Sequence, residues 1–290
     1  MHAHATAASA DRLATDRTAD RTAPRPHAAT ALRATGIAWF ALAALGQLLF
    51  AAYVLGFYGR LALQGRPQDW DRVLPHGYVA GDAWFNLVLA VHLLFAVAVI
   101  AGGLLQFVPR IRRAAPAFHR WNGRAYLLLC AVLALGGLDM VWVRGGVVGD
   151  VWQHLGISLD ALLILGFAGA AWRCARARRI DAHRRWALRL FLAVSGVWFF
   201  RVGLMGWLVV NGGPAGFDPD RFTGPTLTVL SFAQTLLPLG VLQLYLHAQR
   251  RDSPRLRLAV AAGLAGLTLL MLLGIGAATA FMWLPQMAKA

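Results

Sequence analysis

The chain has 290 residues, of which 58% are hydrophobic and 14% are charged, and its mean hydropathy is +0.55. A soluble domain carries roughly 25% charged residues, so this composition excludes an ordinary water-soluble protein and indicates a membrane protein. The net charge of +15 does not indicate nucleic-acid binding, because the basic residues gather in short segments between apolar stretches, as topology determinants do.

Residues 1–34 differ from the rest of the chain. They mix Ala, Thr, Arg and Asp, with three Asp-Arg pairs and few large apolar side chains. We therefore expect a disordered cytoplasmic tail. The segment is too long and too acidic for the start of a cleaved signal peptide, so we expect it to be retained.

Residues 35–290 form the expected membrane domain. Apolar stretches of about 20 residues recur in it, and that is the length a helix needs to cross ~30 Å of hydrocarbon. Most of them lack the polar face that a soluble helix needs. The sequence therefore predicts an all-α membrane bundle of about seven transmembrane helices. The predicted spans are 36–58, 83–108, 125–143, 151–172, 187–210, 225–247 and 258–284.

Lys and Arg are distributed unequally between the two sides of such a bundle. If the spans alternate in direction, 20 of the 28 basic residues lie on the side of the N-terminus and 6 on the other side. The positive-inside rule then predicts a cytoplasmic N-terminus and an outside C-terminus in the cell (inner) membrane. We expect membrane lipids to bind the basic side, and an anionic reductant or substrate to bind at its rim.

Two basic segments resemble each other. QFVPRIRRAAPAFHRWNGRAY leads into the third predicted span, and AWRCARARRIDAHRRWALRL leads into the fifth. Each has an Arg cluster followed by His-Arg and a Trp, so spans 2–3 and 4–5 are predicted to be two copies of one helix hairpin, together forming the core of residues 83–210. Such repeats tend to place functional groups at their interface. Chance combined with the preference for cytoplasmic arginine is the alternative explanation of the match.

Within roughly residues 85–205, three motifs have an ordered spacing: GGLLQFVPRIRR (102–113), HRWNGRAY (119–126) and HRRWALR (183–189). Together with His92 and Arg201, these motifs resemble a bacterial family of predicted integral membrane proteins of unknown function. The resemblance implies a multi-span topology and marks these residues, and it implies no mechanism.

Ionisable side chains inside the spans need an explanation, because each costs ~2.5–3.5 kcal/mol on insertion scales. On a helix His92 shares a face with Gly103 and Gln106, so we expect it to point into the bundle. Arg201 and Asp160 are candidates for a buried ion pair. The polar residues of interest within the spans are His92, Gln106, Asp139, His154, Asp160 and Arg201, and His119 and His183 lie at the cytoplasmic ends of spans 3 and 5.

The four histidines lie on alternate spans at two levels, which suits bis-histidine ligation of haem iron. His92 of span 2 would face His154 of span 4, and His119 of span 3 would face His183 of span 5. The pattern resembles the two-haem cytochrome b proteins, which implies haem b as cofactor and transmembrane electron transfer as function. Nearby arginines would then offset the haem propionates, namely Arg120, Arg124, Arg184 and Arg189.

Two other functions stay open at this point. One is a structural or sensory membrane subunit without chemistry, in which the basic clusters are interfacial residues that extend toward the head groups. The other is a non-haem transporter or proton-coupled carrier. The sequence has no hydrolase motif, nucleotide-binding loop or metal-binding cysteine spacing, and Cys130 and Cys174 are expected to be inert packing residues. The relay of the carrier would consist of His92, Asp139, Asp160 and Arg201.

Overall fold

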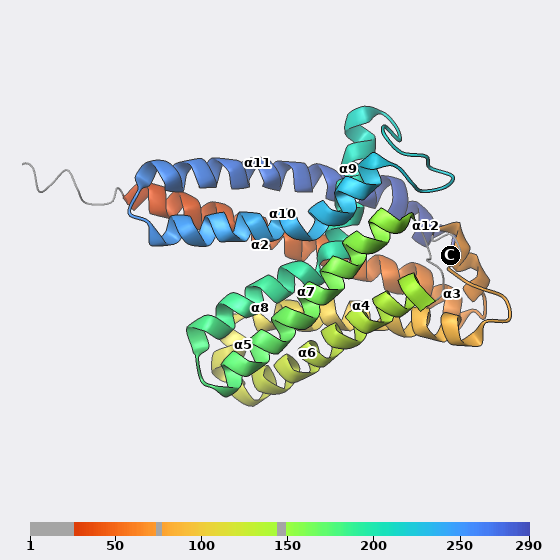
Figure 1. Ribbon diagram of the computed structural model, residues 1–290, viewed down its shortest axis with the longest axis horizontal. Coiled ribbons are helices and arrows are strands. Elements are labelled where there is room, and N and C mark those ends of the chain that lie inside the picture. Colours follow the sequence, from red (N-terminus) through yellow and green to blue (C-terminus); the bar gives the residue numbers. More distant parts are fainter. Residues whose placement is uncertain (1–25, 74–76, 144–148) are drawn as a thin grey trace, which may run out of the picture.

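A computed structural model describes residues 26–73, 77–143 and 149–290 of the chain (Figure 1). In these residues the protein consists of helices, and the only β-structure among them is an isolated bridge between Asp218 and Thr223. Six helical segments are long and apolar enough to cross a bilayer, and the bent pair α8–α9 makes a seventh if it counts as one span. The predicted all-α bundle of about seven spans is thus confirmed.

The helices follow the predicted spans in order. Three spans end in a π-helical turn, and short helices connect or extend the others. The span helices are α2 (Pro26–Val54), α4 (Ala83–Gln106), α6 (Pro116–Leu138), α7 (Val151–Arg176), α8 (Ile180–Val194), α9 (Gly196–Asn211), α10 (Pro225–Arg250) and α11 (Pro254–Ala278). The π-helical turns are η1 (Leu55–Gly59), η3 (Asp139–Val143) and η4 (Thr279–Trp283), and the short helices are α3 (Arg60–Leu63), η2 (Pro67–Arg72), α5 (Pro109–Ala114) and α12 (Leu284–Ala288).

The first span begins earlier than predicted. Helix α2 starts at Pro26, so residues 26–34, which we expected to be disordered, are helical. The reason is tertiary packing, since Leu32 is buried in a small core with Ala248 of α10 and Ala261 of α11. Residues 1–25 of the expected tail lie outside the described residues.

Four helices form the predicted core, which we call the hairpin bundle. Helix α4 packs on α6, α6 packs on α7, and α7 packs on α8, so spans 2–3 and 4–5 are two antiparallel hairpins in contact. Their common core contains Val99 of α4, Cys130 of α6, Ile164 of α7 and Leu190 of α8. The small helix α5 makes the first hairpin turn. The second is a tight turn in which Arg178 has a positive φ of 54°.

Helices α2, α10 and α11 form a second group, which we call the three-helix group. Figure 1 shows the two groups diverging toward the end that carries α5, the α7–α8 turn and the α10–α11 turn. We call this the basic end, because most arginines between the spans lie there. Near mid-length the groups meet through three rings: the Phe40 and Phe107 centroids are 5.3 Å apart and those of Phe107 and Phe191 are 4.9 Å apart.

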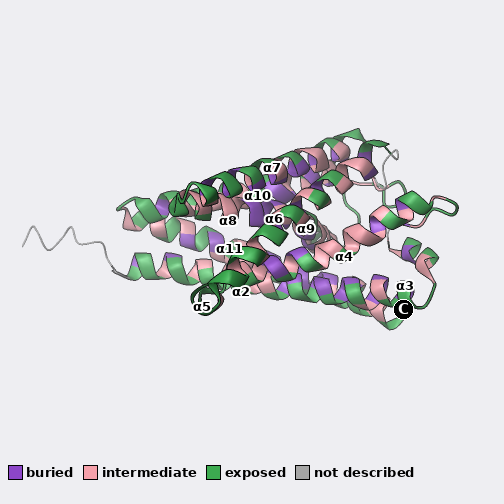
Figure 2. Cartoon of the chain, turned by 90° about the horizontal axis from the view of Figure 1, so that it is seen from below, coloured by how far each residue is buried: buried purple, intermediate pink, exposed green. Residues whose placement is uncertain are grey.

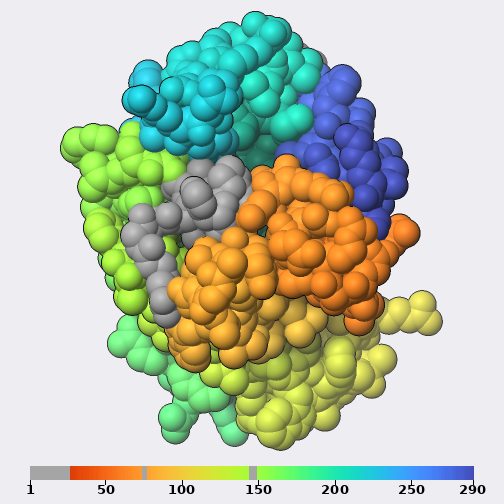
Figure 3. All heavy atoms as spheres, turned by 90° about the vertical axis from the view of Figure 1, so that its right-hand side faces the viewer, coloured from red at the N-terminus to blue at the C-terminus, as the bar shows by residue number. Residues whose placement is uncertain are grey.

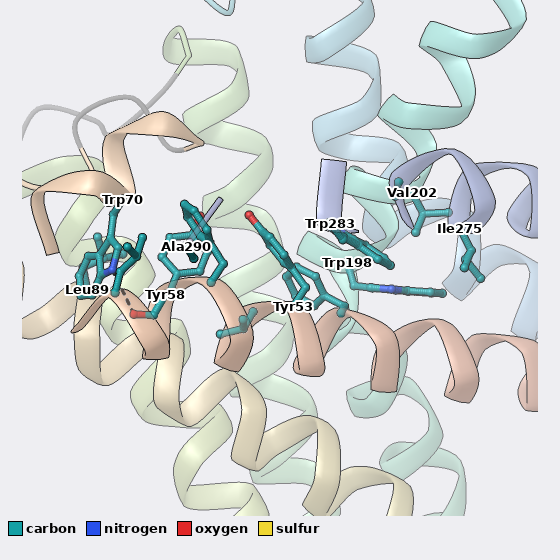
Figure 4. Close-up of a cluster of buried hydrophobic side chains, with 14 of the residues drawn as sticks. Tyr53, Tyr58, Trp70, Leu89, Trp198, Val202, Ile275, Trp283 and Ala290 are labelled. Atoms are coloured by element: carbon teal, nitrogen blue, oxygen red, sulfur yellow. Dashed lines mark hydrogen bonds between the residues drawn. The ribbon is translucent and has the colours of Figure 1, made fainter. Parts of the chain in front are cut away.

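The opposite end holds the larger core. Aromatic rings from α2, η1, η2 and η4 pack in series there, with Tyr53 stacked on Phe57 and on Trp283 at centroid distances of 5.8 Å and 6.1 Å (Figure 4). Trp70 Nε1 donates a hydrogen bond of 3.2 Å to the Tyr58 carbonyl oxygen. Figure 3 faces this end and shows the α9–α10 connection at the top, the C-terminal residues on the right and η1–η2 between them and the centre.

The outward faces of the spans are exposed (Figure 2), and many of the exposed side chains are large and apolar. Leu128 of α6, Leu162 of α7 and Leu269 of α11 are 66%, 61% and 67% exposed. Exposed leucine surfaces of this size are rare on water-soluble proteins, whereas the lipid tails of a bilayer would cover them. Their distribution all around the bundle agrees with a protein that spans the membrane.

Candidate functional site

The fifth span is broken at its centre. Helix α8 ends at Val194, α9 begins at Gly196, and the two axes are bent by 49°. Ser195 lies at the break, and its hydroxyl donates a hydrogen bond of 2.7 Å to the Phe191 carbonyl oxygen. The side chain of Gln47 in α2 donates to the Ser195 hydroxyl oxygen at 2.9 Å. A Ser-Gly pair is a known site of helix breaks, and here a second helix supplies a polar partner to it.

Asp160 of α7 reaches this break from the other side. Its carboxyl group is buried and accepts a hydrogen bond of 2.7 Å from the Thr235 hydroxyl of α10. Only a glycine fits opposite it, because a Cβ at Gly196 would lie 2.7 Å from Asp160 Oδ2. The carboxyl group therefore sits at the first residue of α9, where the positive end of the helix dipole lies. We call Gln47, Asp160, Ser195, Gly196 and Thr235 the mid-span junction.

Helix α10 is also interrupted at this level. Pro238 lies inside the helix and has no N–H to donate, so the carbonyl oxygen of Gln234 lacks its usual helical partner. Gln234 and Ser231 are buried beside Thr235, and Ser231 packs closely on Gly156 of α7. Helix α10 thus presents two polar side chains about one turn apart, Ser231 and Thr235, to α7 within a membrane span, where polar groups are expensive.

Arg201 does not pair with Asp160. Its guanidinium carbon lies 5.6 Å from the centre of the Phe50 ring, and its Nε is buried with no hydrogen-bond partner within the described part of the chain. Asp160 has Thr235 as its partner instead. The proposed ion pair is therefore wrong: Arg201 of α9 is directed to α2, whereas Asp160 approaches the first residue of α9.

His92 points into the hairpin bundle, as predicted. Its Nδ1 is buried, and a Cβ at Gly136 of α6 would lie 3.7 Å from that atom. On the same face of α4, Gln106 donates a hydrogen bond of 3.2 Å to the His119 carbonyl oxygen, and the ring of Tyr126 packs against Gly103. The HRWNGRAY segment is therefore the helix surface on which the C-terminal half of α4 packs.

His154 lies at a different level from His92. Its ring packs edge-on against Trp142 of η3 at a centroid distance of 6.1 Å. His92 lies against Gly136 of α6, and His154 lies against Trp142 of η3. These two contact residues are six positions apart, which is about 9 Å at 1.5 Å per residue. Opposed ligands of one iron lie at matching depth, so His92 and His154 do not fit a shared haem in this arrangement. Asp139 lies between these contact points, at the first residue of η3.

His119 and His183 lie within electrostatic range of each other at the basic end. His183 Nδ1 lies 3.0 Å from the Ala171 carbonyl oxygen of α7, which leaves Nε2 as the nitrogen that can bind a ligand. His119 Nδ1 is buried without a hydrogen-bond partner among the described residues, and the imidazole of His183 lies within its electrostatic range, as do the guanidinium groups of Arg112 and Arg120.

The arginines after these histidines follow one pattern in both hairpins. The guanidinium group of Arg124 stacks on Trp121 at 4.7 Å from the ring centre, and that of Arg189 stacks on Trp186 at 4.9 Å. Arg189 also donates hydrogen bonds to the Arg185 carbonyl oxygen and to Gln243 Oε1. Arg120 and Arg184 are exposed at the surface. The His-Arg-Trp repeat thus has a structural counterpart, a Trp that holds the Arg three residues later.

Four members of the mid-span junction were missed from the sequence: Gln47, Ser195, Gly196 and Thr235. They are uncharged, and the reasoning had weighted ionisable groups. The available signals were a Gln inside an apolar span, a Ser-Gly pair in mid-span and a Pro three residues after Thr235. Among the described residues, no group of three or more His, Cys, Asp or Glu side chains could hold a metal ion.

Fold and site together define a multi-span α-helical membrane protein with a broken span and a polar junction at mid-membrane. Residues 89–219 match the model of a family described as predicted membrane protein (DUF2306), which confirms the resemblance to an uncharacterised membrane-protein family. No curated protein and no solved structure matches the chain, and none of these comparisons supports the analogy with cytochrome b.

We expect the junction to tolerate no side chain at Gly196. In Gly196→Ala the added methyl group would lie 2.7 Å from Asp160 Oδ2 and 3.2 Å from Thr235 Oγ1, and overpacking of this kind destabilises by about 1–3 kcal/mol. Thermal unfolding in detergent should show a lower midpoint. The matched control is Gly166→Ala in α7, where a Cβ meets nothing within 4 Å. Equal midpoints for both variants would show that the junction is loosely packed.

Proposed function

We propose that the protein is a proton-coupled membrane carrier in which Asp160 takes up and releases the proton. One observation carries this proposal: a buried carboxyl group lies at the first residue of a half-helix, beside a break in the middle of a span. Transporters typically build their coupling sites from discontinuous helices at the bilayer midplane. Of the four residues expected to form a relay, Asp160 is the one that lies in this junction.

The two charge states of Asp160 would act differently on the break. An ionised carboxylate is attracted to the N-terminus of α9 by roughly 0.3–2 kcal/mol, and this attraction is lost on protonation. The protonated carboxyl group would instead need an acceptor for its own O–H. Because Asp160 and Thr235 join α7 to α10 at this point, a change in either contact would alter how α9 is held against both helices.

Water access near the junction should therefore depend on pH. A Cys replacing Ala233, on α10 two residues from Thr235, should react with an impermeant maleimide at a rate that is measured relative to an exposed reference cysteine, because the thiol's own ionisation changes every such rate with pH. This relative rate should differ between acidic and alkaline buffer. Asp160→Asn cannot ionise and should abolish the difference, whereas Asp181→Asn at the exposed start of α8 should retain it. Wild-type pH dependence that survives in Asp160→Asn would exclude Asp160 as the coupling group.

We further propose that the basic end faces the cytoplasm and that the protein lies in the cell (inner) membrane. The connection 212–224 contains one Arg and two Asp, whereas residues 248–257 contain four Arg, and the positive-inside rule favours the latter on the cytoplasmic side. The N-terminus would then be cytoplasmic and the C-terminus outside.

Single cysteines test this orientation in intact cells. In a background without Cys130 and Cys174, an impermeant maleimide should modify Ala215→Cys and spare Asp252→Cys, because only the former would face outward. Both positions are exposed, so breaking the cells should make the second reactive and serves as the control. Modification of Asp252→Cys alone in intact cells would reverse the orientation.

A second candidate function is electron transfer through a b-type haem at the basic end. Two observations favour it: His183 lies within electrostatic range of His119, and the Nδ1 of His183 is fixed by a backbone carbonyl oxygen, as the outer nitrogen of a ligating histidine usually is. In this proposal the two histidines would be the axial ligands of one haem, which would supply one-electron redox chemistry when bound. The chain's own arginines, Arg120 and Arg184, would attract an anionic reductant or the propionates.

The haem proposal has a direct spectroscopic test. Protein purified from cells supplied with haem should be red, with the bands of a low-spin bis-imidazole iron and no more than one haem per chain. His119→Ala and His183→Ala should each remove the colour, while His27→Ala, at an exposed position of α2, should keep it. A colourless wild type, made under conditions that load a known cytochrome b, would end this proposal. A structural or sensory role stays if neither candidate function survives its test.

A further inference from the structure

A groove runs along α10 on the side that faces α8. It has a volume of about 1160 Å³, and its lining residues come from α8 of the hairpin bundle and from α10 of the three-helix group. Toward the basic end it is lined by Arg185, Arg189, His247 and Arg250, and toward mid-membrane by apolar side chains of α10 such as Leu236 and Val241. The groove is therefore polar and cationic at one end and apolar along the rest.

The cationic end of the groove has arginine side chains that can bind an anion. Arg189 is held by hydrogen bonds to the Arg185 carbonyl oxygen and to Gln243, and it stacks on Trp186. Arg185 and Arg250 lie within electrostatic range of Arg189. No acidic side chain lines the groove, and no ion pair among the described residues neutralises these three guanidinium groups. Clustered arginines without carboxylate partners suit a phosphate group.

The apolar part of the groove suits a hydrocarbon chain. From Arg250 to Ala233 the groove follows 17 residues of α10, or about 26 Å, which exceeds the ~15 Å depth of one leaflet's hydrocarbon. Leu236, Leu237 and Leu244 are 48%, 54% and 58% exposed, so the groove is open toward the bilayer. A soluble anion would gain nothing from this surface.

A second apolar cavity continues the groove. It has a volume of about 380 Å³, lies between α9, α10 and α11, and includes the rings of Trp39 and Phe199. The two cavities share Ala233, Leu237 and Val241, which form one stripe of α10 at a spacing of four residues. Together they offer space for apolar chains on both sides of this stripe.

We propose that the groove is a specific site for one anionic phospholipid, with its phosphate on Arg185, Arg189 and Arg250 and an acyl chain along the α10 stripe. The proposed site binds the negatively charged head group through its arginines and the acyl chain through its apolar residues. It therefore discriminates against zwitterionic lipids, which carry no net charge, and against phosphate alone, which has no acyl chain. It also places a lipid between the two helix groups at the point where they separate. The inference does not depend on the proton-coupled or haem function.

Native mass spectrometry of the detergent-solubilised full chain tests this site. With phosphatidylglycerol, wild type should retain one lipid more tightly than the others, and Arg250→Gln should weaken that binding by roughly tenfold, because it removes a charge-assisted contact. The matched control is Arg251→Gln, one residue further on and outside the groove; it should bind as wild type. Equal weakening by both variants would mean that net charge alone attracts the lipid, and would refute the site.

A second variant tests the acyl chain without touching the charges. A Cβ at Gly240 meets nothing within 4 Å, so Gly240→Phe should fold and fill the groove, and it should also weaken phosphatidylglycerol binding. Inorganic phosphate and phosphatidylcholine are the competing probes. Competition by phosphate at the same concentration, competition by phosphatidylcholine at the same concentration, or unchanged binding in Gly240→Phe would each overturn the proposal.

Discussion

Polar groups in the hydrocarbon layer have no water to bond with, and the break between α8 and α9 places several of them at mid-span. The structure meets this constraint with side chains from three other helices. Gln47 of α2 bonds to the Ser195 hydroxyl group, while Asp160 of α7 reaches Gly196 and is itself held by Thr235 of α10. These contacts tie the broken span to both helix groups at a single level. The positions of α2, α7 and α10 are therefore coupled to the geometry of one break.

The contacts between the groups are unequal along the membrane normal. At the opposite end, a continuous aromatic core joins α2, α4, α9 and α11, and α9 and α11 come into backbone contact at Gly206 and Gly274. At the basic end the hairpin bundle and the three-helix group each have their own core and are separated by the α8–α10 groove. Phe40, Phe107 and Phe191 lie between these two regions. The two helix groups are therefore packed together at the opposite end, and the packing between them is weakest at the basic end, where the cationic groove lies.

Much of this fold followed from the sequence, because apolar length and arginine placement are local properties. These properties were sufficient to predict the number of spans, the two hairpins and the inward direction of His92. The break at Ser195 was missed, because 187–210 is apolar throughout and a length criterion treats it as one straight helix. The helical start at Pro26 was missed because Leu32 is stabilised by residues more than 200 positions later.

The site was less predictable than the fold. Ionisable residues in spans were correctly identified as unusual, but their partners depend on how the helices are rotated, and rotation is a tertiary property. Arg201 was assigned to Asp160 from charge alone, whereas the structure directs it to the Phe50 ring. The HRWNGRAY motif contains an Asn-Gly pair at 122–123. Its role is helix contact, since Asn122 Nδ2 donates to the Gly102 carbonyl oxygen at 2.9 Å.

The three π-helical turns have a consequence for the phase of their helices. η1, η3 and η4 end α2, α6 and α11 at the same end of the molecule, and each turn holds more residues than an α-helical turn. Residues after such a turn are therefore rotated about the helix axis relative to the positions that an uninterrupted α-helix would give them. Within η1 itself, Phe57 and Tyr58 are adjacent in sequence and both lie in the same buried core. The residues that form the aromatic core can thus face inward even where the α-helical period of the preceding span would direct them elsewhere.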